Sequence, residues 1–96
     1  MRRAARVDGS HSLIVDTLRN VGCSVQSLAQ VGDGAPDLLV GRAGRNYLLE
    51  VKTVARASQL NETQAQWHRL WRGKVCVVRT PEEALVAVGL TEAVGT

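Results

Sequence analysis

Two short apolar runs separated by a glycine-containing link place the strongest constraint on how this chain folds. Residues 37–40 and 46–54 are rich in Leu, Val and Tyr, and the link GRAGRN between them contains two glycines. Runs of this composition joined by a few residues that include Gly predict a β-hairpin. The two strands of such a hairpin are antiparallel, so the start of the first lies beside the end of the second.

The second strand carries charge where an apolar core is expected. Glu50 and Lys52 lie within the run YLLEVK, and residues two apart on a strand point to the same face. Asp37 begins the first strand and is therefore expected at the same end of the hairpin. Buried charges are costly unless they are paired or bind a metal. On these residues alone, a solvated ion pair on an open sheet face remains the alternative interpretation.

The residue types at this end of the hairpin suit a hard cation. The carboxylates of Asp37 and Glu50, with a backbone carbonyl expected to be that of Val51, supply the oxygen ligands that Mg²⁺ prefers. Lys52 would orient or deprotonate an attacking water, or stabilise charge developing on a phosphate. The pattern therefore predicts a metal-dependent site, whereas nothing in it indicates an organic cofactor.

The segments around the hairpin predict a layered α/β fold. Residues 11–21 carry apolar side chains at helical spacing and stop at Gly22, with Asp8 or Ser10 as the expected N-cap. The other expected elements are a strand at residues 23–28, a helix at 61–71 capped by Asn61 or Thr63, a strand at 75–79 and a helix opening at Pro81. The predicted order is α-β-β-β-α-β-α, a mixed sheet flanked by helices.

Length and composition indicate one globular domain over residues 1–96. Hydrophobic residues make up 45% of the chain and charged residues 22%, with a mean hydropathy of -0.05. Aromatic residues are only 3%, which argues against a protein that stacks bases on an aromatic surface. Trp67 and Trp71 are accordingly expected in the core.

The charge balance mildly favours a polyanionic partner. The net charge is +3 and the isoelectric point about 9.4, and residues 1–8 are expected to form a flexible basic N-terminus, for which simple solvation is the alternative. No apolar run reaches the ~20 residues that span a bilayer, and the start has no signal-peptide pattern, so we expect a cytoplasmic protein without membrane contact. Cys23 and Cys76 lack metal-ligand spacing and are expected to be reduced thiols in the core.

Pro36 and Asp37 are followed by the hairpin, then by Glu50 and Lys52, and then by a helix that carries Gln64. The order of these features resembles the PD-(D/E)xK nuclease superfamily. Within it, the chain is most similar to the small stand-alone VRR-NUC type of phage and DNA-repair nucleases. The likeness covers HSLIVDTLRNVG at residues 11–22 and the stretch from GAPDLL to EEAL at residues 34–85. It implies a restriction-endonuclease-like core and a DNA endonuclease dependent on Mg²⁺ or Mn²⁺. Asp37 and Glu50 would be the ligands, Lys52 the catalytic lysine and Gln64 a neighbour of the site.

One position departs from the family pattern. Many members carry an acidic residue on the first helix that completes the metal site, and His11 stands at the aligned position. His11 would coordinate the metal, contact a phosphate or have no role, which leaves open whether one or two metals bind. A noncatalytic DNA-binding or assembly module that keeps the nuclease fold is therefore the alternative, and a small α/β domain with an incidental ion pair is a third interpretation.

Several basic side chains are expected to contact DNA phosphates. They are Arg42 and Arg45 beside the hairpin turn, Arg56 after the second strand, and His68 and Arg69 on the second helix. Solvation alone remains the alternative for each. Because so small a domain has little surface for reading sequence, we expect selectivity for branched, flap or junction DNA. Two sites related by a two-fold axis would match a double-stranded substrate, which predicts a homodimer, in the host cytoplasm if the protein is phage-encoded.

Overall fold

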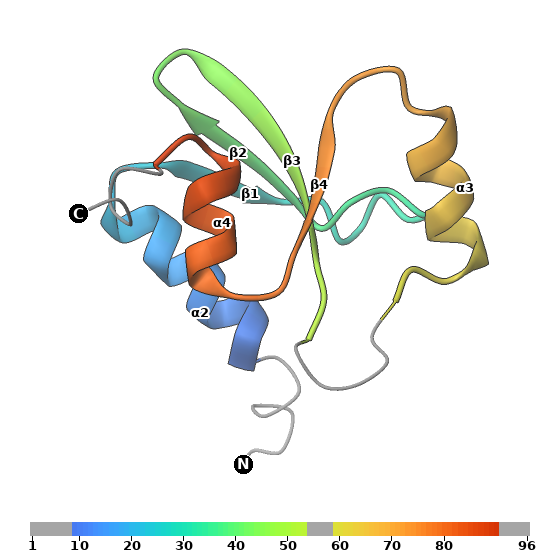
Figure 1. Ribbon diagram of the computed structural model, residues 1–96, viewed down its shortest axis with the longest axis horizontal. Helices are drawn as coiled ribbons and strands as arrows, with labels where there is room; N and C mark the ends of the chain where they lie inside the picture. Colours follow the sequence, from blue (N-terminus) through green and yellow to red (C-terminus); the bar gives the residue numbers. More distant parts are fainter. Residues whose placement is uncertain (1–8, 54–58, 91–96) are drawn as a thin grey trace.

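The structure is a computed structural model that describes residues 9–53 and 59–90 (Figure 1). These residues form the elements α2 (Gly9–Asn20), β1 (Ser24–Ser27), β2 (Leu38–Arg42), β3 (Arg45–Val51), α3 (Glu62–Leu70), β4 (Val75–Val78) and α4 (Pro81–Ala87). The predicted α/β class and the order α-β-β-β-α-β-α are confirmed. The basic N-terminus with Asp8, the end of the predicted second hairpin strand at residue 54, and Arg56 lie outside the described residues.

The four strands form one mixed sheet in the order β1-β2-β3-β4. β2 and β3 are the predicted antiparallel hairpin, with Leu38 opposite Leu49 and Arg42 opposite Arg45. β4 runs parallel to β3, and the Lys52 amide continues this pairing by donating to the Val78 carbonyl at 3.0 Å. The pairing therefore holds the end of β3, where the charged residues lie, between two neighbouring segments.

The core lies between one face of the sheet and the helices α2 and α4, which pack side by side (Figure 1). Alternate residues of the hairpin point into it, since Leu38, Val40 and Leu49 are buried. The helices and β4 contribute Ile14, Leu18, Val78, Ala84 and Val88. Both cysteines are free thiols, but only Cys23 is buried, because Cys76 on β4 is partly exposed. No helix in the described part of the chain is long and apolar enough to cross a membrane.

α3 lies apart from the other helices, on the opposite side of the strands (Figure 1). None of its nine residues, all of which are described, is buried. The prediction that Trp67 and Trp71 belong to the core is wrong, because Trp67 is only partly buried and Trp71 remains 47% exposed. The two indoles instead stack on each other, with centroids 4.6 Å apart. Helical spacing placed them correctly on one face, but neither indole is buried against the sheet.

The loop between β1 and β2 contacts the start of α3. Gly34 has a φ of +87°, and a Cβ there would lie 2.5 Å from the Thr63 carbonyl oxygen. The loop backbone therefore passes directly against the first turn of the helix. This contact requires glycine both for its backbone conformation and for space.

Candidate active site

The hairpin brings Asp37 to the end of β3. The Asp37 amide donates to the Leu49 carbonyl at 3.1 Å, although Leu49 is also the register partner of Leu38, so Asp37 and Leu38 both meet Leu49. Asp37 is thereby held against the end of β3, and its Oδ2 accepts a 2.7 Å hydrogen bond from the Val51 amide. The Asp37 carboxylate is thus held beside the last residues of β3, just before β2 begins.

Glu50 is the one buried charged side chain among the described residues, with 1% of its surface exposed. Its Oε2 accepts from the Gln64 side-chain amide at 3.1 Å, whereas its buried Oε1 has no hydrogen-bond partner in the described part of the chain. Burial, reinforced by the neighbouring carboxyl group of Asp37, raises the pKa of Glu50 to about 7, although the charge of Lys52 opposes the shift. Two carboxyl groups facing each other in a buried position would be stabilised by a cation.

Lys52 and Gln64 complete a connected group of polar side chains around Glu50. Lys52 Nζ lies 2.9 Å from Gln64 Oε1 and 3.8 Å from Glu50 Oε2, and the lysine side chain is 16% exposed. The Gln64 amide therefore bridges Lys52 and Glu50. It links the first turn of α3 to the end of β3.

A capping box fixes the orientation of Gln64. The Asn61 side chain accepts from the Gln64 backbone amide at 2.9 Å, while Gln64 Oε1 accepts from the Asn61 backbone amide at 3.0 Å. Asn61 is thus the N-cap, one of the two expected. The sequence carries the signal for this arrangement, an Asn followed three residues later by a Gln. The same side chain therefore both starts the helix and orients the candidate site.

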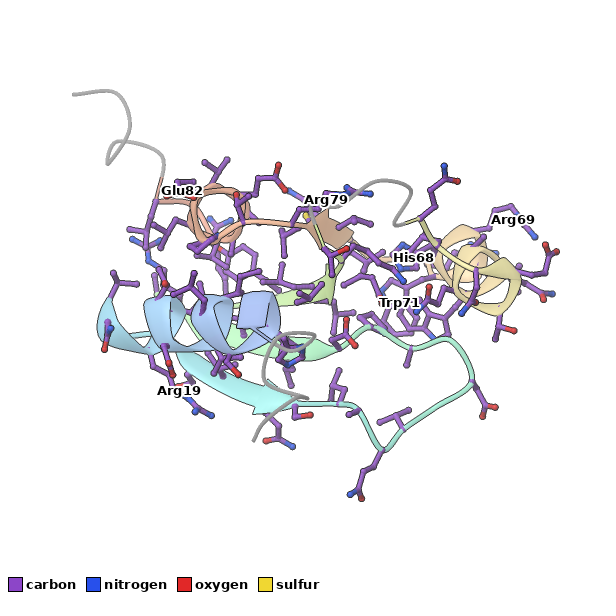
Figure 2. The ribbon with its side chains drawn as sticks, turned by 90° about the horizontal axis from the view of Figure 1, so that it is seen from below. Arg19, His68, Arg69, Trp71, Arg79 and Glu82 are labelled. Carbon is purple, nitrogen blue, oxygen red and sulfur yellow. The ribbon has the colours of Figure 1, made fainter. Side chains whose placement is uncertain are left out.

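His68 lies beside this group, one turn further along α3. In Figure 2 its side chain points from α3 toward the rest of the molecule, whereas Arg69 points away. Burial, followed by the positive charge of Lys52, lowers the pKa of His68. Its Nε2 is buried without a hydrogen-bond partner among the described residues. His68 therefore faces the site, and Arg69 lies exposed on the outer side of the helix.

The donor atoms at this end of β3 fit a divalent cation. The amide and carbonyl of one strand residue point to the same edge, so the Val51 carbonyl faces the side where its amide meets Asp37. It joins two carboxylates, and Glu50 Oε1 has no hydrogen-bond partner among the described residues, so the set has the oxygen donors that Mg²⁺ or Mn²⁺ prefers. In the described residues no group of three His, Cys, Asp or Glu side chains that could hold a metal ion is found, and His11 lies in the first turn of α2.

Two of the predicted DNA contacts lie at the other end of the hairpin. Arg42 is five residues from Asp37 along an extended strand, which is roughly 17 Å at ~3.4 Å per residue. Its Nη1 donates to the Val88 carbonyl at 3.0 Å and so satisfies the end of α4. Arg45 is exposed beside it. Arg42 and Arg45 lie at the hairpin turn, as predicted. That turn is remote from the carboxylates of Asp37 and Glu50.

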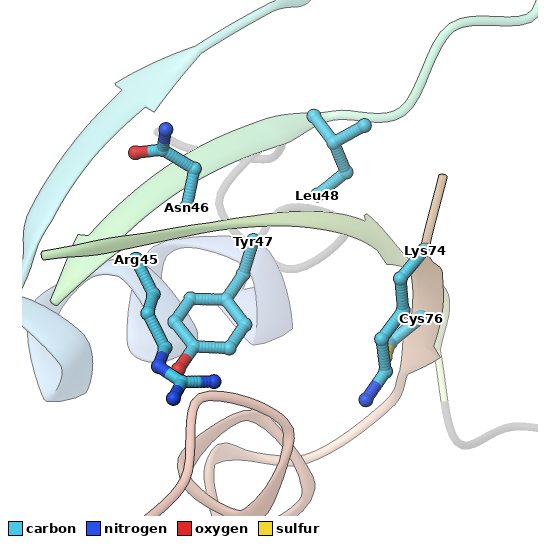
Figure 3. Close-up of a pocket in the computed structure, with 6 residues that line it drawn as sticks. All are labelled: Arg45, Asn46, Tyr47, Leu48, Lys74 and Cys76. Atoms are coloured by element: carbon cyan, nitrogen blue, oxygen red, sulfur yellow. The ribbon is translucent and has the colours of Figure 1, made fainter. Parts of the chain in front are cut away.

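That distant end also holds a cavity of about 350 Å³ between β3 and β4 (Figure 3). It is lined by Arg45, Asn46, Tyr47, Leu48, Lys74 and Cys76. None of the carboxylates, Lys52 or Gln64 contributes to its wall. The candidate active site is therefore a surface-bordering group of side chains and not the cavity.

No protein-family model, curated protein or solved structure matches this chain. The residues themselves and the contacts among them are therefore the basis for inferring function. Those contacts join Asp37, Glu50, Lys52 and Gln64 into one group, with His68 at its border.

Proposed function

We propose that this protein is a divalent-metal-dependent DNA endonuclease with a restriction-endonuclease-like core. The observation that carries the proposal is Glu50, a buried carboxyl group beside Asp37 and 3.8 Å from Lys52 Nζ, one oxygen of which has no hydrogen-bond partner among the described residues. A structural role alone does not account for this arrangement, because an apolar residue would fill the position without the cost of burying a carboxylate.

Asp37, Glu50 and the Val51 carbonyl would hold Mg²⁺ or Mn²⁺. When bound, such an ion acts as a Lewis acid on the phosphate and makes water a stronger nucleophile. Lys52 has a different task, since its ammonium group has donor hydrogens beyond the one directed to Gln64. These would position the attacking water or a phosphate oxygen and stabilise negative charge that develops there.

Gln64 acts as a positioning residue in this scheme. Its Oε1 accepts from Lys52 and its Nε2 donates to Glu50, so one amide sets the orientation of both groups. The capping box prevents that amide from rotating freely. The lysine and the carboxylate therefore remain aligned before substrate binds, which lowers the cost of organising the site in the transition state.

The charge of the chain supports a nucleic-acid substrate. A net charge of +3 with an isoelectric point of about 9.4 attracts a polyanion without identifying its sequence. A domain of 96 residues has little area for contacts to base edges, so we propose selectivity for branched, flap or junction DNA. We further propose a homodimer, because two sites related by a two-fold axis match a double-stranded substrate.

Cleavage of defined DNA substrates tests this function. Linear, flap and four-way-junction DNA would be incubated with the wild-type protein in EDTA, Mg²⁺ or Mn²⁺. The same assay would use Lys52→Ala and Asp37→Ala, with Arg19→Ala as the control, because Arg19 is an exposed basic residue on α2, on the other side of the sheet. We expect metal-dependent cutting by the wild type and Arg19→Ala, and at least a ~100-fold loss in the other two variants.

Two outcomes would contradict the proposal. If the wild type binds DNA but cuts none of these substrates with either metal, a noncatalytic DNA-binding module is favoured. If Lys52→Ala and Asp37→Ala cut as fast as the wild type, the assignment of the site is wrong.

A further inference from the structure

A continuous row of side chains leads from the candidate active site to an exposed indole. Lys52 is hydrogen-bonded to Gln64 and lies close enough to His68 for its charge to affect the imidazole. The His68 ring meets Trp67 edge-on at 5.9 Å, and Trp67 stacks on Trp71. The step from Lys52 to His68 is electrostatic, and the steps from His68 to Trp67 and from Trp67 to Trp71 are ring contacts.

The row follows one face of α3. Trp67, His68 and Trp71 are three, four and seven residues after Gln64, which is the spacing of a single helical face. Figure 2 shows His68 and Trp71 on the same side of α3, with Arg69 on the other. Seven residues of helix span about 10 Å at 1.5 Å per residue, so Trp71 lies roughly that far from the amide that orients Lys52.

The geometry of the two indoles is that of a stacking surface. Their centroids are 4.6 Å apart and the rings are within 14° of parallel. Trp71 keeps 47% of its surface exposed although one side lies on Trp67, so the side turned away from Trp67 is open. Gly73 passes close to the indole nitrogen, because a Cβ at that position would lie 2.8 Å from Trp71 Nε1.

The surroundings of Trp71 favour a nucleic acid over an apolar partner. Arg72 follows it directly, Lys74 comes two residues later, and both are exposed. Exposed cations next to an aromatic face bind the two parts of a nucleotide, since the cations attract the phosphate and the ring stacks on the base. A base paired within a duplex has its faces covered by its neighbours, so only an unpaired base offers a free face to Trp71.

We propose that Trp71, supported by Trp67, binds an unpaired nucleobase next to the cleavage site. This inference rests on the proposed nuclease function and identifies the feature of branched DNA that the protein recognises. A stacked strand rises about 3.4 Å per nucleotide, so the ~10 Å between Gln64 and Trp71 places this base within about three nucleotides of the scissile phosphate. Because stacking tolerates any base, the contact selects DNA structure and not sequence.

Equilibrium binding without metal tests the inference separately from cleavage. Fluorescence anisotropy in EDTA would give the Kd of the wild-type protein for three DNAs. They are a duplex with a single-stranded overhang, the same DNA with abasic sites in the overhang, and a blunt duplex with the same number of phosphates. The variants are Trp71→Ala, Trp71→Tyr, which keeps an aromatic face, and Leu70→Ala, the control at a neighbouring apolar side chain that is 68% exposed.

We expect Trp71→Ala to weaken binding of the overhang DNA at least about 5-fold, the lower end of measured base-stacking effects. Binding of blunt DNA would be unchanged, and Trp71→Tyr and Leu70→Ala would remain close to wild type. Abasic sites would weaken binding by the wild type but have no further effect on Trp71→Ala, since the stacking partner is already lost.

Equal weakening for overhang and blunt DNA would overturn the inference. So would an unchanged Kd, or a change from dimer to monomer in Trp71→Ala, which would make this surface a protein interface. These outcomes differ from failure of the proposed function, which is the absence of metal-dependent cutting whatever the DNA-binding result.

Discussion

Replacing Glu50 by glutamine is expected to stabilise the metal-free protein at alkaline pH. Burial and Asp37 raise the pKa of Glu50 from 4.5 to about 7 in the folded state. Below pH 4.5 the carboxyl group is protonated whether the chain is folded or unfolded. Between pH 4.5 and 7 only the folded state retains the proton, so stability falls as the pH rises and levels off above 7.

The size of this loss follows from the pKa shift. At 1.36 kcal/mol per pKa unit, the shift corresponds to roughly 3 kcal/mol between acid and alkaline pH. Glutamine has nearly the same shape and does not ionise; its oxygen can accept from Gln64 and its amide can face Asp37. Allowing for imperfect geometry, we expect Glu50→Gln to be about 2 kcal/mol more stable at pH 8, which raises Tm by roughly 10 °C in a domain of this size.

Thermal unfolding in EDTA at pH 5 and pH 8 measures the effect, with Asp33→Asn as a control at an exposed acidic residue. The low pKa of His68 adds its own pH dependence, with stability lost as the pH falls through that value, but this contribution is common to both proteins. Added Mn²⁺ should stabilise the wild type at pH 8 and not Glu50→Gln. The reasoning is refuted if Glu50→Gln is no more stable than wild type at pH 8, or if its advantage is as large at pH 5.

Substitutions at Gly34, Arg42 and His11 test the fold and the edges of the site. Gly34→Ala should lower the free energy of unfolding in urea by at least ~2 kcal/mol, because its Cβ would overlap the Thr63 carbonyl. Gly32→Ala, the control with a φ of +74° but open space, should lower it by about 1 kcal/mol. Equal losses would contradict the contact between Gly34 and Thr63. Arg42→Ala should lower stability by ~1 kcal/mol through its lost hydrogen bond and leave cleavage unchanged, whereas slower cleavage would give Arg42 a part in the site. His11→Glu should retain or raise cleavage and His11→Ala should lower it, and no change in either would place His11 outside the mechanism.

The hairpin and the element order could be predicted because local signals agreed along the chain. Apolar runs joined by a glycine-containing link identified β2 and β3, and antiparallel pairing then required Asp37 to meet the end of β3 near Glu50. The signal for the start of α3 is also local, since Asn61 and Gln64 form a capping box within four residues. These parts of the site needed no knowledge of tertiary packing.

Features that depend on how elements pack could not be predicted. The spacing of Trp67 and Trp71 is compatible with a core face or with an exposed stack, and only the position of α3 away from the sheet decides between them. Arg42 was expected to contact DNA, but its hydrogen bond to the end of α4 joins residues 46 positions apart in the chain. Burial of Glu50 likewise follows from the docking of α3 and β4 around β3.

Anomalous diffraction from crystals soaked in Mn²⁺ tests the central claim most directly, because it locates the cation without requiring turnover. The account predicts a peak at the end of β3, bounded by Asp37, Glu50 and the Val51 carbonyl, which disappears in crystals of Glu50→Gln. No peak at saturating Mn²⁺, or a peak that excludes both carboxylates, would contradict it.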